Sequence, residues 1–264
     1  MKSAPTEKPS IVEDVHLALL YGVLGAFAVL LLFPYLLETM PQAFAKSPLP
    51  LPVVAVAQAA QGFVLLTLLS LAGLRMGHAV GLGSPWLRAL RFGRPRTAQP
   101  WLRAAALGVA SGLAIVALSP LFDAQMPAPI HPLPAGSPAT ASWTGFLASF
   151  YGGIAEEVEL RLFLMTLIVW VVVKLMRRGP GPALFWIAIL AAALLFGAAH
   201  LPAAAKIWPL DTVVVLRTIA LNGVGGIVFG WLYWKQGLES AVLGHFSADL
   251  VLHVAAPLIA GALA

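Results

Sequence analysis

A cluster of four charged residues interrupts the largely apolar stretch from residue 143 to residue 176: Glu156, Glu157, Glu159 and Arg161. A charged side chain at the centre of a membrane helix costs roughly 2.5 to 3.5 kcal/mol on insertion scales, so clustered charges must pair or share a polar interior. Glu157 and Arg161 are four positions apart and can pair on one helix face. Glu156 and Glu159 point away from that pair, and each therefore needs a partner from another helix.

Two other apolar segments carry polar groups at the same four-residue spacing. Phe196 and His200 end one segment, and His245 and Asp249 lie in another. Because residues four apart share a helix face, three helices each present polar groups to a common interior. A carboxylate and an imidazole that meet at one water form a general base, and a second imidazole with a short polar side chain could stabilise an oxyanion. These residue types predict a buried hydrolytic site.

Simpler interpretations of the same residues are open. The charges between residues 156 and 161 could mark a helix end at the headgroup level. His200 or His245, taken singly, could form a hydrogen bond between two helices. The remaining histidines are interpreted as loop, interface or packing residues: His16, His78, His131 and His253. Four glycines are expected to allow close helix packing: Gly223, Gly225, Gly226 and Gly230.

The composition predicts an all-α fold, a polytopic bundle of membrane helices. Of 264 residues, 60% are hydrophobic and 10% are charged, which is far from a soluble domain. The chain has no cysteine, so disulfides and thiol chemistry are excluded. The net charge of +5 is attributed to membrane topology and not to nucleic acid, because the arginines lie in short loops between spans.

Seven spans are expected, or eight if the last one breaks near Pro257. We predict a disordered cytoplasmic tail over 1–15 and one membrane domain over 16–264. The arginines between residues 75 and 103 have no acid among them, which marks a cytoplasmic connection and places the N-terminus inside, in a bacterial inner membrane. The predicted spans are 17–37, 53–74, 102–121, 143–176, 183–200, 213–234 and 238–259.

This arrangement raises one geometric difficulty. At roughly 1.5 Å per residue, His200 lies about 28 Å along its helix, near the outer end. His245 lies only about 10 Å into its own span from the cytoplasmic side. The two imidazoles can share a site only if the helices shift in depth, for example if the helix over 143–176, which is longer than the bilayer core, projects into the cytoplasm.

The three motifs resemble those of the CPBP family, which includes type II CAAX prenyl endopeptidases and bacteriocin-processing membrane proteins. The family pattern is Glu-Glu-x-x-x-Arg, then Phe-x-x-x-His, then His-x-x-x-Asn or Asp, on successive helices. Here it is matched by residues 156–161, 196–200 and 245–249. The resemblance covers about 143–252 and leaves the first three spans without support.

The resemblance implies an intramembrane endopeptidase that cleaves a membrane-associated or prenylated substrate. Glu156 with His200 would activate a water, and His245 with Asp249 would hold the oxyanion. Prenyl-protein proteases carry Asn where this chain has Asp249; an Asn amide can donate to an oxyanion, whereas an ionised Asp only accepts. Asp249 would therefore have to be protonated, orient His245 instead, or act as a metal ligand. The resemblance also implies that Glu157 and Arg161 orient the site. Glu159 is an extra acid outside the motif.

A metal-independent glutamate-type site is the favoured chemistry, with no cofactor. Glu and His side chains are possible Zn²⁺ ligands, but the chain has no His-Glu-x-x-His pair. Two other functions fit the same residues. One is a non-proteolytic membrane scaffold or bacteriocin-immunity protein of the same fold. The other is an ion or proton carrier, for which buried acids and imidazoles are equally natural.

Overall fold

The computed structural model describes residues 10–45, 47–94, 99–130 and 136–263, and the regular structure of this part is entirely helical. The all-α prediction is therefore confirmed. The elements are α1 (Ile11–Thr39), α2 (Pro41–Phe44), α3 (Leu51–Val80), α4 (Pro85–Arg91), α5 (Trp101–Leu118), α6 (Pro120–Asp123), α7 (Pro138–Phe150), η1 (Tyr151–Glu156), η2 (Val158–Met165), α8 (Thr166–Met176), α9 (Pro182–Ala199), α10 (Leu201–Ala204), α11 (Thr212–Gln236), α12 (Leu238–Asp249), η3 (Leu250–Ala255) and α13 (Ala256–Leu263).

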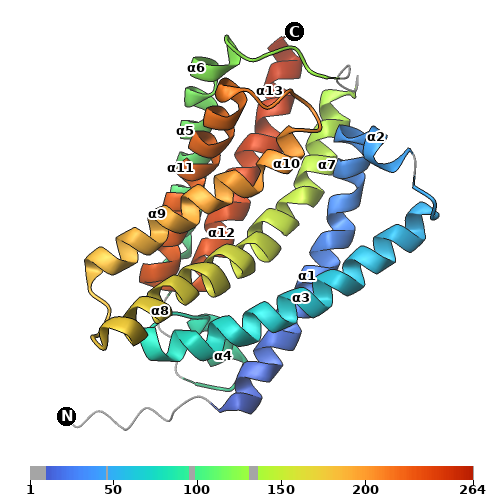
Figure 1. Cartoon of the computed structure of the whole chain (residues 1–264). Helices are drawn as coiled ribbons and strands as arrows, with labels where there is room; N and C mark the ends of the chain where they lie inside the picture. The colour runs from blue at the N-terminus through green and yellow to red at the C-terminus, as the bar shows by residue number, and fades with distance from the viewer. Residues whose placement is uncertain (1–9, 46, 95–98, 131–135, 264) are drawn as a thin grey trace.

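Six helical runs in the described part are long and apolar enough to cross a membrane: Ile11–Thr39, Leu51–Val80, Trp101–Asp123, Pro182–Ala204, Thr212–Gln236 and Leu238–Leu263. The predicted charged span forms a further helical run through α7, η1, η2 and α8. The last run continues past Pro257, and the π-helical turn η3 precedes that proline where a break was considered. The total of seven crossings remains a prediction. The start of α1 and the end of α13 lie at opposite ends of the bundle, as an odd number of crossings requires (Figure 1).

Helix α1 begins within the segment predicted to be a disordered tail. Its first turn starts at Ile11, where the Ser10 side chain caps the helix by accepting a hydrogen bond from the Glu13 backbone. The following acid, Asp14, is fully buried and pairs with Arg75, His78 and Arg88. Glu13 pairs with Arg88 and Arg94. Only residues 10–15 of the predicted tail are described, and these contacts order them as part of the bundle.

Small residues let the helices approach closely. The most extensive packing joins α1 to α3, α9 to α11 and α5 to α12. A methyl group on Gly108 of α5 would collide with the carbonyl oxygen of Gly244 on α12, so only glycine fits there without a shift. A methyl group on Gly226 would lie 2.8 Å from Ala193, and one on Gly230 would lie 3.1 Å from Ile189, both on α9. The packing prediction holds at these two positions.

The other two glycines of that group differ. Gly225 faces the Phe229 ring of its own helix, and Gly223 faces open space. The packing prediction is therefore wrong for Gly223, because this face of α11 has no neighbour there.

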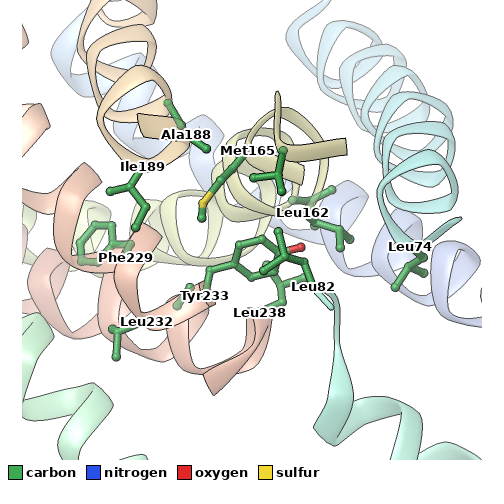
Figure 2. Close-up of a cluster of buried hydrophobic side chains, with 14 of the residues drawn as sticks. Leu74, Leu82, Leu162, Met165, Ala188, Ile189, Phe229, Leu232, Tyr233 and Leu238 are labelled. Carbon is green, nitrogen blue, oxygen red and sulfur yellow. The ribbon is translucent and has the colours of Figure 1, made fainter. Parts of the chain in front are cut away.

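The apolar core fixes the charged run against α9, α11 and α12. Figure 2 shows side chains from η2, α9, α11 and α12 meeting in one cluster, with Leu74 and Leu82 closing it from α3 and the following turn. Its polar member, Tyr233, forms a 2.7 Å hydrogen bond with the Thr166 hydroxyl, so the buried phenol is satisfied. This packing sets the position of η2, and with it that of the adjoining charged residues.

Candidate active site

The structure brings the polar residues of three separate helices together around Glu156. Its Oε1 lies 3.7 Å from Nε2 of His200, which follows the last residue of α9. Its Oε2 lies 3.7 Å from Nε2 of His245 on α12. The same His245 nitrogen lies 3.7 Å from Oδ1 of Asp249, one turn further along α12. One carboxylate therefore faces two imidazoles and lies near a second carboxyl group.

The predicted difficulty of depth does not arise in the structure. His200 and His245 both contact the carboxylate of Glu156, so the two rings belong to one site. The axial count overestimated their separation because it treated the helices as parallel. Figure 1 shows α9 crossing the bundle obliquely, so position along this helix does not translate directly into depth.

Both imidazoles are held by their second ring nitrogen. Nδ1 of His200 donates to the Phe196 carbonyl at 2.9 Å, and Nδ1 of His245 donates to Oε1 of Glu157 at 2.8 Å. A carbonyl or an ionised carboxylate can only accept, so both donors are the Nδ1–H groups. Each Nε2 is thereby directed toward Glu156.

Glu157 and Arg161 form a fully buried ion pair behind this cluster. Nη1 of Arg161 lies 3.0 Å from Oε1 of Glu157, as their four-residue spacing predicted. Nη2 of Arg161 donates to the Gly226 carbonyl at 3.2 Å. Glu157 therefore connects Arg161 to His245. This buried ion pair holds the imidazole of His245 in place.

Two phenylalanines enclose these charges. The guanidinium carbon of Arg161 lies 5.1 Å from the Phe196 ring centroid and 5.6 Å from that of Phe229. The His245 ring stacks on Phe229 at 4.4 Å and meets Phe196 edge-on at 5.8 Å. Cation–π contacts of this kind are stronger when desolvated. Phe229 was not predicted to be a site residue.

π-helical turns and one glycine shape the site in ways that spacing did not predict. Glu156 ends the π-helical segment η1, and Asp249 directly precedes η3. Such wide turns are rare and occur frequently at functional sites. A methyl group on Gly152 would collide with Oδ2 of Asp249 and lie 3.1 Å from Nε2 of His245. The missing side chain lets η1 approach α12 closely.

Glu159 stands apart from these contacts. It makes no ion pair or hydrogen bond with any other residue in the part of the chain that the structure describes. The structure brings together the other six predicted residues: Glu156, Glu157, Arg161, His200, His245 and Asp249. Of the histidines assigned to packing or interfaces, His78 pairs with Asp14, and His131 lies outside the described residues.

The described residues contain no group of three or more His, Asp or Glu side chains arranged to hold a metal ion. The chemistry of the donors themselves leaves Zn²⁺ binding conceivable, because carboxylate oxygens and imidazole nitrogens are both zinc ligands. Metal independence remains a prediction, with a chelation test described below.

Carboxylates and imidazoles enclosed by long apolar helices define an integral membrane protein with a polar interior site. The type II CAAX prenyl endopeptidase Rce1-like family model matches residues 138–251, a segment that contains all six of these residues. This match over residues 138–251 supports the resemblance to the CPBP family that the three motifs predicted. No curated protein and no solved structure matches the chain significantly.

Proposed function

We propose that the protein is an intramembrane endopeptidase in which Glu156 and His200 activate a water for attack on a peptide carbonyl. The observation that carries this proposal is the position of Glu156, with an imidazole Nε2 3.7 Å from each of its two oxygens. Contacts of 3.7 Å exceed a direct hydrogen bond, and water commonly bridges polar groups at such distances. A water bound there lies within reach of a carboxylate and a neutral imidazole, the usual components of a general base.

His245 and Asp249 are assigned to the developing oxyanion. Since Nδ1 of His245 is engaged by Glu157, the ring donates from Nε2 when it is protonated, and the negative charge of Glu157 favours that form. Arg161 offsets the charge of Glu157 in turn. The two roles thus fall to different residues. Glu156 and His200 act as the base, and His245 and Asp249 on α12 stabilise the oxyanion.

The substrate is proposed to be a peptide presented from the membrane, such as a prenylated CAAX tail, a leader peptide or a membrane-protein segment. Two observations support this class. His200, His245 and Asp249 lie on two of the six candidate membrane spans, and the helical run that carries Glu156 packs against both, so a water-soluble chain would have to enter the bundle to reach them. The matching family model describes endopeptidases that act on CAAX prenyl proteins.

The test is Glu156→Gln in purified protein reconstituted into liposomes with a panel of prenylated and unprenylated membrane peptides. Gln keeps the size of the side chain and removes the base, so kcat should fall by about 10²- to 10⁴-fold. Glu159→Gln is the matched control, because this neighbouring acid makes no ion pair or hydrogen bond with the other site residues, and its turnover should stay within about 3-fold of wild type. Wild-type turnover in the Glu156 variant would contradict the proposed base.

The same preparation separates the competing functions. Activity that EDTA abolishes and Zn²⁺ restores would contradict the metal-free assignment. Proton flux without peptide cleavage would instead indicate a carrier, and neither activity in a folded protein would indicate a scaffold or immunity protein.

A further inference from the structure

Asp249 has an imidazole on each side along its own helical run. Its Oδ1 lies 3.7 Å from Nε2 of His245 and 4.0 Å from Nε2 of His253, which are four residues before and after it. The helical run of α12 and η3 thus carries an imidazole, a carboxyl group and a second imidazole at four-residue spacing. The family motif ends at Asp249, and His253 lies beyond it, just outside the matched segment.

The carboxyl group of Asp249 lacks a direct partner in a place where its charge is costly. The residue is only 8% exposed, and no described residue donates a hydrogen bond to it. Glu156 and Glu157 bring two more carboxylates to the same site, against one arginine. A buried carboxyl among other acids is disfavoured in its charged form, and it needs a proton or a cationic neighbour.

His253 connects this buried group to a more open part of the protein. Its side chain is 38% exposed, against 6% for His245, so it is the less enclosed of the two imidazoles. The edge of the Tyr35 ring packs against it at 5.8 Å, which holds the imidazole beside Asp249. The titratable groups that face the Asp249 and His253 pair from all packed elements are Tyr35, Glu156, Glu157, His200 and His245.

We propose that His253 is a positioning residue that acts through Asp249, and that the two residues together supply one O–H donor to the oxyanion. The pair shares one proton. While the proton is on Asp249, the carboxylic acid can donate its O–H to the oxyanion and His253 is neutral. No proton is consumed overall, because it remains on the pair through the reaction. The 4.0 Å gap between Oδ1 of Asp249 and Nε2 of His253 is one that a single water molecule can bridge.

This inference rests on the proposed endopeptidase function and is tested by a double-mutant cycle on the full-length protein in liposomes. His253→Gln should lower kcat by about 10-fold or more, because an oxyanion donor is weakened. In an Asp249→Asn background the amide donates by itself, so the same His253→Gln change should lower kcat by less than about 2-fold. His16→Gln, which removes a histidine that stacks on Phe92 away from the site, is the control expected to leave kcat unchanged.

The pH profile gives a second readout that a purely structural role would not change. Wild-type kcat should fall at alkaline pH as the pair loses its proton. Asp249→Asn should move that limb to the pH at which His245 alone loses its Nε2 proton, while the variant keeps measurable turnover. Equal fold losses from His253→Gln in both backgrounds would overturn the inference, as would inactivation by Asp249→Asn or an alkaline limb that is the same in this variant and in wild type. If His253→Gln does not fold, Asp249→Asn alone decides. If wild-type protein cleaves the peptide and Glu156→Gln abolishes this cleavage, the proposed function stands even when the inference about His253 fails.

Discussion

Removing the Glu157 side chain should destabilise the protein through Arg161. Both side chains are completely buried, and Glu157 is the only ion-pair partner of the arginine among the described residues. Breaking a buried pair by deleting one partner costs about 3 to 5 kcal/mol, because the remaining charge is uncompensated. Glu157→Ala should therefore shift the unfolding equilibrium by about 10²- to 4 × 10³-fold, at about 1.4 kcal/mol for each factor of ten.

Replacing both charged residues together should destabilise the protein less than the two single replacements would if their effects were added. A pair of apolar residues of similar size is often tolerated where a lone charge is not. Glu157→Leu combined with Arg161→Met leaves only the Gly226 carbonyl and Nδ1 of His245 without their partners, at about 1 to 3 kcal/mol each. The loss of stability in the double variant should thus be smaller than the sum of the losses in the two single variants, by a coupling energy of about 1 to 3 kcal/mol.

The assay is denaturant titration of the detergent-solubilised protein, followed by the fluorescence of its 8 tryptophans. The matched control is Asp123→Ala, which breaks the 2.8 Å pair with Arg217, where the side chains are 48% and 28% exposed. An exposed pair should contribute only about 0 to 1 kcal/mol. Equal effects of Glu157→Ala and Asp123→Ala, or strict additivity in the double variant, would refute the buried-pair reasoning.

Two further predictions concern the bundle. Gly108→Ala should cost about 1 to 3 kcal/mol in the same titration, because the added methyl group collides with a backbone carbonyl of α12, whereas Gly179→Ala, with no atom nearby, should be neutral. The chain has no cysteine, so single exposed cysteines report topology directly. In spheroplasts a membrane-impermeant maleimide should label Gln125→Cys and not Arg91→Cys, and the reverse pattern would place the N-terminus outside.

The sequence predicted the helical fold and the residues that meet in the site because charge is so costly in apolar segments. With few polar groups available, those at i and i+4 on three helices must face inward, and the contacts of Glu156 with His200 and His245 follow that logic. The pairing of Glu157 with Arg161 also follows from spacing alone. The catalytic roles of these residues are still predictions.

Features that depend on how whole helices pack could not be predicted. Periodicity assumes regular helices, so it did not anticipate the π-helical turns beside Glu156 and Asp249. It carries no information on tilt, which led to the apparent conflict of depth between the imidazoles. Phe229 resembled ordinary core until the structure placed it against His245 and Arg161.

The contacts of Asp14 also constrain how the chain is assembled during synthesis. The first helix leaves the ribosome well before the three residues that pair with its buried acid, Arg75, His78 and Arg88. The full set of pairs with Asp14 can therefore form only after residue 88 has been translated. A truncation that removes this acid would leave the arginines of the connecting segment without this partner.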